Sequence, residues 1–238
     1  MNGDRLLARP EMELPENIAA VTFDAGGTLI EPSPSVGHVY AAVAAEHGHP
    51  NCDPARLNRS FREAWRAKKG FDYSKLAWAE IVAATFAAPD SAAERVDFFE
   101  ALYERFAQPS AWRIYDDVVP CLAWLREHSF RIGLISNWDE RLAPLLRRLG
   151  LARYFQATLI SFEFGFHKPD RELFDEAARK LALSPSHILH VGDSAAEDYG
   201  GATAAGFSAL LLRRDGSASG VETISSLAEI PALLARGH

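Results

Sequence analysis

The sequence predicts an α/β fold in which a parallel sheet carries an inserted helical module. Short apolar runs rich in β-branched residues recur along the chain, and helical patterns separate them. Parallel strands are buried on both faces and therefore read as nearly continuous apolar runs. One long stretch, residues 33–112, holds helical patterns and no such run. A chain of 238 residues with 48% hydrophobic residues is long enough for one domain with a sizeable insertion.

The expected strands and helices alternate outside that stretch. The strands are residues 19–25, 131–137, 157–163, 187–193 and 208–213. The helices are residues 140–150, 171–183 and 225–237, of which the first ends at a glycine stop signal. This alternation is typical of a parallel sheet covered by helices on both faces.

Residues 33–112 are expected to form a helical bundle inserted after the first strand. Its helices are residues 39–48, 55–69, 75–88 and 92–107. In open α/β sheets, ligands bind at the carboxyl ends of the strands, so a module that leaves the chain there would cover the site. We therefore expect a core of residues 15–32 and 113–238, with residues 33–112 as its cap.

Composition excludes several classes of function. The net charge of −7 disfavours nucleic-acid binding and gives no attraction to an anionic membrane surface. No apolar run approaches the ~20 residues of a membrane span, and the first residues lack the apolar stretch of a signal peptide. Two cysteines make no disulfide framework. We expect a cytoplasmic protein that acts on a small molecule; nothing in the sequence indicates its oligomeric state.

Residues capable of chemistry gather at the carboxyl ends of the expected strands. They are Asp24 at the end of the first strand, with Gly26, Gly27 and Thr28 following; Ser136 and Asn137 at the end of the second; Lys168 beyond the third; and Asp193 at the end of the fourth, with Glu197 and Asp198 just beyond. Each alone has an ordinary structural explanation, because an aspartate after a strand is most often a helix N-cap. Their occurrence together at one edge of the sheet predicts a site.

These residue types suit transfer of an anionic group. Asp24 is placed to attack an electrophile as a carboxylate nucleophile. The two glycines that follow it let backbone N–H groups approach a bound anion closely. Thr28 would orient this loop by a hydrogen bond, and Ser136 with Asn137 would bind a phosphoryl oxygen. Lys168 would balance charge between the nucleophile and an anionic substrate.

The acidic residues predict a divalent cation. Asp24 and Asp193, with Asp198 or Glu197 in support, offer the hard oxygen ligands that suit Mg²⁺. Carboxylates so close together repel one another without a cation. A bound metal would also shield the phosphate from the charge of the nucleophile.

The four motifs, in this order, resemble those of the haloacid dehalogenase-like (HAD) hydrolase superfamily. The matching residues are Asp24-Ala-Gly-Gly-Thr28, Ser136-Asn137, Lys168-Pro169-Asp170 and Gly192-Asp193 with Asp198, within residues 19–213. Four ordered motifs are far more specific than any one. The resemblance implies a Rossmann-like core with an α-helical C1 cap. It also implies a Mg²⁺-dependent phosphohydrolase that acts on a small phosphorylated metabolite through a phospho-aspartyl intermediate on Asp24.

One departure from the family pattern matters. Phosphatases of the family carry a second aspartate, a general acid and base, two residues after the nucleophile; here that residue is Gly26. General acid–base help is worth ~10²–10⁴ in rate. Turnover is therefore expected to be slow, or limited to good leaving groups such as acyl phosphates, unless Glu31 or His38 supplies the proton. The Gly26 carbonyl remains available as a metal ligand.

Four alternatives stay open at this point. A metal-independent 2-haloacid dehalogenase also lacks the second aspartate, but the pair Asp193 and Asp198 favours phosphoryl transfer. A phosphonatase uses a Schiff-base lysine from the cap, for which the candidates are Lys68, Lys69 and Lys75. A catalytically impaired protein would keep the fold for interactions alone. Ser194 follows a strand in the manner of a nucleophile elbow, although the terminal His238 is the one histidine after it.

Overall fold

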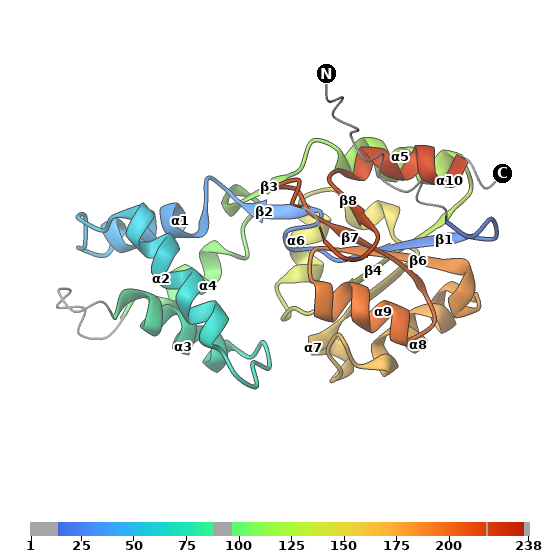
Figure 1. Ribbon diagram of the computed structural model, residues 1–238. Helices are drawn as coiled ribbons and strands as arrows, with labels where there is room; N and C mark the ends of the chain where they lie inside the picture. Colours follow the sequence, from blue (N-terminus) through green and yellow to red (C-terminus); the bar gives the residue numbers. More distant parts are fainter. Residues whose placement is uncertain (1–13, 88–96, 218, 236–238) are drawn as a thin grey trace, which may run out of the picture.

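The computed structural model describes residues 14–87, 97–217 and 219–235. Within them a six-stranded sheet runs in the order β5-β4-β1-β6-β7-β8, and every neighbouring pair is parallel (Figure 1). The strands are β1 (Ala20–Phe23), β4 (Arg131–Ser136), β5 (Ala157–Ile160), β6 (Ile188–Gly192), β7 (Ser208–Leu212) and β8 (Thr223–Ile224). The predicted α/β fold with a parallel sheet is confirmed.

Strand β1 lies at the centre of the sheet. Val21 pairs with Ile132 of β4 on one side and with Leu189 of β6 on the other. All four residues of β1 are buried, as expected for a strand covered on both faces. Asp24 directly follows β1, so this register places its side chain between the ends of β4 and β6.

Helices cover both faces of the sheet. One face packs against α5 (Val118–Glu127), α6 (Leu142–Arg148) and α10 (Ile230–Ala235), and the other against α8 (Arg171–Leu181) and α9 (Gly201–Ala204). Helix α7 (Ser161–Phe164) and a single π-helical segment, Ala195–Gly200, follow β5 and β6 at the carboxyl edge. Among the described residues, no helix combines the length and the apolar character needed to cross a bilayer.

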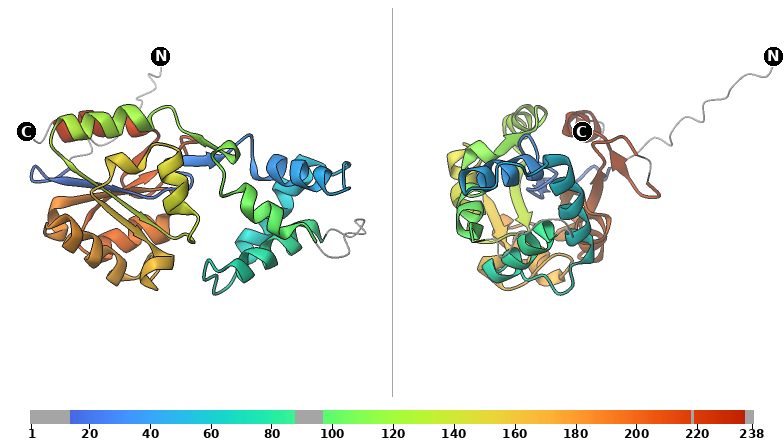
Figure 2. Two further views of the ribbon diagram at one scale, coloured as in Figure 1. Left: turned by 180° about the vertical axis from the view of Figure 1, so that it is seen from behind. Right: turned by 90° about the vertical axis from the view of Figure 1, so that its left-hand side faces the viewer.

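Four helices between β1 and β4 gather beside the carboxyl edge of the sheet (Figures 1 and 2). They are α1 (Val36–Glu46), α2 (Pro54–Ala67), α3 (Lys75–Phe86) and α4 (Phe99–Arg105). They enclose an apolar cluster of their own, which includes Val43, Leu57 and Leu102. A two-stranded antiparallel ribbon, β2 (Ile30–Pro32) with β3 (Trp112–Ile114), joins them to the sheet. The division into core and cap at residues 33 and 112 stays a prediction.

Side-chain caps begin several of these helices. The carboxylate of Asp53 accepts hydrogen bonds from the backbone N–H groups of Ala55 and Arg56, at 2.9 and 3.1 Å, and Pro54 occupies the first helical position of α2. The hydroxyl of Ser74 accepts from the N–H of Ala77 at 3.1 Å at the start of α3. These local signals fix where the chain enters each helix.

The prediction of a strand over residues 157–163 is wrong at its end. Strand β5 stops at Ile160, and α7 begins at Ser161. The Ser161 hydroxyl accepts from the N–H of Trp138 at 3.0 Å and donates to the carbonyl of Trp138 at 3.1 Å, so it is held by the loop after β4. Short apolar runs do not distinguish a strand from a buried helical turn. The first residues of the expected helix 92–107 and the last two of 225–237 lie outside the described residues.

Replacing Leu134 by alanine should lower the free energy of unfolding by about 2–5 kcal/mol. Leu134 is fully buried in β4, so the exchange removes apolar contacts and leaves a cavity. Leu76 on α3 is 72% exposed, and Leu76→Ala should cost less than about 0.5 kcal/mol. Urea unfolding of both variants measures the difference, and equal losses would contradict this account of the core.

Candidate active site

Asp24 lies at the carboxyl end of the central strand with its side chain anchored on one oxygen. Its backbone N–H donates to the carbonyl of Val191 at 3.0 Å, which ties it to β6. Its Oδ1 accepts from Ser136 Oγ at 2.9 Å and from Lys168 Nζ at 2.7 Å. Both donors bind Oδ1, so Oδ2 is the oxygen to which no described residue donates. Asp24 is only 7% exposed.

Lys168 joins two carboxylates in the buried part of the site. Its ammonium lies 2.7 Å from Asp24 Oδ1 and 2.5 Å from Asp198 Oδ1. Asn137 holds the lysine's backbone, since its Oδ1 accepts from the Lys168 N–H at 2.7 Å and its Nδ2 donates to the Lys168 carbonyl at 2.8 Å. The amide also donates to Glu197 Oε2 at 3.0 Å. The Asn137 side chain thus orders the residues around it. It also lines the hollow beside Asp24, and its role in binding substrate stays a prediction.

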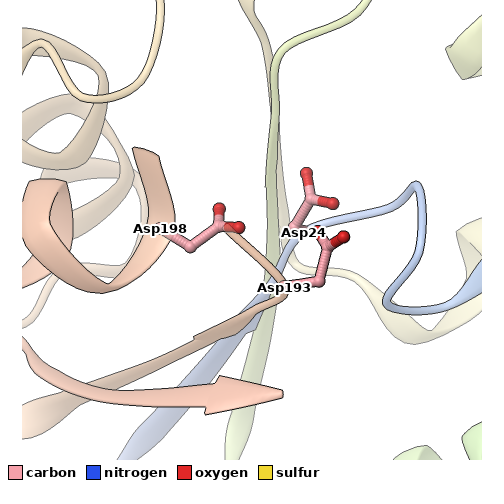
Figure 3. Close-up of side chains that lie close together, drawn as sticks. All are labelled: Asp24, Asp193 and Asp198. Carbon is pink, nitrogen blue, oxygen red and sulfur yellow. The ribbon is translucent and has the colours of Figure 1, made fainter. Parts of the chain in front are cut away.

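Asp24, Asp193 and Asp198 form a cluster of carboxylates (Figure 3). Ligand oxygens of the three lie within 4.8 Å of one another. Asp198 is fixed by the N–H of Ser194, 2.9 Å from its Oδ2, and by His190 Nε2, 3.2 Å from its Oδ1. His190 in turn contacts Thr22 Oγ1 at 2.9 Å through Nδ1. The role of this buried histidine was not anticipated, because it lies inside an apolar strand.

The three carboxyl groups ionise differently because their surroundings differ. Burial raises the pKa of Asp193 to about 7, and the charges of Asp24 and Asp198 add to this effect. Burial also raises the pKa of Asp24, although Lys168 opposes it. Burial would raise the pKa of Asp198 too, but Lys168 and His190 outweigh it and hold that pKa below its usual range. One ammonium therefore does not compensate all three acids.

The donor set fits Mg²⁺. Hard carboxylate oxygens are the ligands that this cation takes in proteins, and a divalent charge would offset the uncompensated acids. The backbone is shaped to bring them close. Gly27 has φ +74°, and a Cβ there would lie 2.5 Å from Asp193 Oδ2, so the loop and the carboxylate approach each other only because residue 27 is glycine.

Trp138 lies close to Gly26. A Cβ built on Gly26 would lie 3.0 Å from Cζ3 of Trp138, so a side chain at residue 26 would require the indole to shift slightly. Neither substitute proton donor lines the described hollow beside Asp24. Glu31 accepts from Arg113 and from the hydroxyl of Tyr115, and His38 pairs with Ser35. Among the described residues, neither of these two side chains therefore takes the place of the second aspartate.

Two further expectations differ from the structure. The hydroxyl of Thr28 is buried and has no partner among the described residues, so the hydrogen bond expected to orient the Asp24 loop is absent; the Thr28 carbonyl instead accepts from Arg214 at 2.7 Å. Ser194 accepts from the N–H of Glu197 at 3.2 Å and caps the helical turn after β6. This role explains Ser194 without a nucleophile elbow.

The site opens into a hollow of about 480 Å³, here called the main hollow. The wall on the side of helices α1–α3 consists of Val36, Phe61, Trp65, Lys68, Tyr73 and Trp78. Of these, the sequence had singled out Lys68 alone, as a Schiff-base candidate. Tyr73 has φ +59°, an uncommon value for a bulky residue, and its ring stacks on His167 at 5.6 Å. Lys68 lies over the Trp65 ring at 3.7 Å, whereas Lys75 pairs with Glu100 at the surface.

Comparison with known proteins agrees with this architecture. The human haloacid dehalogenase-like hydrolase domain-containing protein 3 is 33% identical over 206 residues, which cover 82% of this chain and 82% of that protein. Glyceraldehyde 3-phosphate phosphatase of Methanopyrus kandleri is 37% identical over 106 residues, covering 42% of this chain and 43% of that protein.

A solved structure extends the similarity to the whole fold. The 2-haloacid dehalogenase of Pseudomonas syringae pv. Tomato DC3000 is similar with a TM-score of 0.65 and 28% identity, over 92% of this chain and 99% of that one. A family model described as haloacid dehalogenase-like hydrolase matches residues 18–206. The chain belongs to the haloacid dehalogenase-like hydrolase family and is an enzyme of this hydrolase class.

Proposed function

We propose that the chain is a Mg²⁺-dependent phosphohydrolase that acts on a small phosphorylated molecule through a phospho-aspartyl intermediate on Asp24. One observation carries the proposal: the Asp24 carboxylate is held on Oδ1 by Ser136 and Lys168, at 2.9 and 2.7 Å, beside two further carboxylates. A binding module has no need of a carboxylate oriented in this way. The phosphatase among the relatives supports the same reading.

The roles follow from the contacts. Oδ2 of Asp24, free of described donors, attacks phosphorus while Oδ1 stays anchored. The Lys168 ammonium, bound to two carboxylates, opposes the rise in the pKa of Asp24 that burial causes, and it offsets the charge of the incoming phosphoryl group. Water then releases phosphate from the aspartyl group and regenerates the carboxylate.

Asp24, Asp193 and Asp198 would hold the magnesium ion, with the Gly26 carbonyl as a further candidate ligand. When bound, the ion would supply positive charge next to the phosphoryl oxygens. The carboxylates meet at one point because β1 and β6 are adjacent parallel strands. The Gly27 N–H donates to the carbonyl of Ile30 at 2.9 Å, so of the two glycines it is Gly26 whose backbone N–H would face the phosphoryl group.

A second candidate, a metal-independent 2-haloacid dehalogenase, is favoured by Gly26, because a leaving halide needs no proton. The similar dehalogenase structure supports it. The acid cluster argues against it, since three carboxylates within 4.8 Å have no evident use without a cation. The phosphohydrolase would require Mg²⁺ and the dehalogenase would not, so one assay with and without the metal separates the two candidates.

Replacing Asp24 by asparagine should lower phosphate release from p-nitrophenyl phosphate and acetyl phosphate by at least about 10³-fold. The amide keeps the shape of the side chain but cannot attack phosphorus. Asp175→Asn, on the exposed surface of α8, is the matched control and should retain activity. Phosphate release is measured with and without Mg²⁺, and 2-chloropropionate is assayed for halide release. Halide release without metal would establish the dehalogenase instead, and no turnover of any substrate would leave only an interaction role.

Magnesium should raise the melting temperature more at about pH 8 than at about pH 5.5. Without metal, folded Asp193 keeps its proton up to about pH 7, whereas the unfolded chain releases it near pH 3.8. The folded state therefore binds more protons between these values, and its stability falls as pH rises through them. A cation that requires the ionised carboxylate recovers this loss at high pH. Calorimetry of the wild type beside Asp193→Asn measures the difference, which should disappear in the variant; an equal magnesium effect at both pH values would contradict the assignment.

A further inference from the structure

We propose that the substrate is an aryl phosphate, a phosphate ester of a phenol, whose ring enters an aromatic cavity between helices α1–α4 and the loop after β4. This inference rests on the phosphohydrolase function proposed above and names its substrate class. Two independent features lead to it: the lining of a second hollow that shares residues with the first, and the glycine at residue 26, which has no side chain to donate a proton.

The second hollow, here called the aromatic annex, lies between helices α1–α4 and the loop after β4. Its volume is about 90 Å³, and the walls that it shares with the main hollow are Pro32, Val36, Phe61, Trp78, Trp112 and Trp138. Beyond these it is lined largely by Tyr40, Val82, Phe99, Leu102, Tyr103 and Phe106. A cavity of about 150 Å³ holds benzene. The annex is smaller, but it adjoins the main hollow of about 480 Å³ and shares six lining residues with it, so the ring is placed across their junction.

The annex presents no uncompensated charge among its described residues. Arg141, its one charged residue, donates to both carboxylate oxygens of Asp139 and to the carbonyl of Tyr103. A charged tail would find no partner there and would lose its hydration. An uncharged ring would gain edge and face contacts with the aromatic walls. The buried indole N–H of Trp78 has no described partner, so a ring substituent that accepts a hydrogen bond would satisfy it.

The chemistry at residue 26 favours the same substrate class. Because residue 26 is a glycine, it supplies no proton to a leaving oxygen. An alkoxide leaves poorly without a proton, whereas a phenol, with a pKa of about 10, leaves as a stabilised phenolate. Asp24 forms a bond to phosphorus as the bond between phosphorus and the ring oxygen breaks. That oxygen keeps the bonding pair. Water then cleaves the phospho-aspartyl group, and its proton passes through solvent to the phenolate.

Comparing phenyl phosphate with benzyl phosphate tests the chemistry. The two substrates carry the same ring, but the leaving group of phenyl phosphate is a phenolate and that of benzyl phosphate is an alkoxide. The wild-type kcat/KM for phenyl phosphate should exceed that for benzyl phosphate by at least about 100-fold, the lower range of general-acid help. Equal rates would overturn the inference, because they would require a proton donor at the leaving oxygen.

Filling the annex tests the location. Val82 is 4% exposed and lines the annex but not the main hollow. Val82→Phe should lower the ratio of kcat/KM for 1-naphthyl phosphate to that for acetyl phosphate by at least about tenfold. Leu76→Phe adds a ring to the exposed side of the same helix and should leave the ratio as in the wild type. An unchanged ratio in Val82→Phe would also overturn the inference.

The outcomes distinguish this inference from the proposed function. If acetyl phosphate is hydrolysed through Asp24 and aryl phosphates are not, the phosphohydrolase stands and the aryl class is wrong. If no phosphate ester or acyl phosphate is hydrolysed, both fail. The phenyl and benzyl comparison uses wild-type protein and therefore decides even if Val82→Phe does not fold.

Discussion

The ion pairs between Lys168 and the carboxylates of Asp24 and Asp198 are the interactions on which the site depends. All three side chains are nearly excluded from water, and taking charges out of water is costly unless they are paired and hydrogen-bonded. Removing one partner from such a group typically costs about 3–5 kcal/mol, because the other charge is left buried. The hydrogen bonds of Asn137 to the backbone of Lys168 therefore also help to fix Asp24, which the lysine binds. If the Lys168 side chain took another rotamer, Asp24 would lose this partner.

The order of the strands explains why these groups meet. Asp24 and Asp193 directly follow β1 and β6, and Ser136 ends the adjacent strand β4, so their side chains emerge at one edge of the sheet. Burial raises the pKa of Asp193 there, and the charges of Asp24 and Asp198, which one lysine does not neutralise, add to this effect. Under the proposed function, a divalent cation would offset this imbalance and a phosphoryl anion would bind next to it. Cation, anion and protein would then have complementary charges only when all three are present.

The strands and the parallel sheet could be predicted from the sequence because the signals for them are local. Runs such as residues 131–137 are apolar throughout, and the order of elements leaves few topologies for a parallel sheet. The aromatic residues that α1–α3 contribute to the wall of the main hollow were not predictable, because an aromatic residue at helical spacing is usually core. Tyr73 lines the site only through the path of the chain between α2 and α3, where its φ is positive. The contact of Trp138 with both hollows likewise depends on how the loop after β4 folds, which the sequence does not reveal.

Gly26 and Trp138 lie next to each other in the site. A Cβ at residue 26 would lie 3.0 Å from Cζ3 of Trp138, and the same indole lines both the main hollow and the annex. A general acid at residue 26 would therefore require the indole to shift slightly, and this shift would alter a wall of both hollows. Under the inference above, the residue that lacks a proton donor and the side chain that bounds the pocket for the organic group are coupled through this contact, and both favour leaving groups that are flat, apolar and stable as anions.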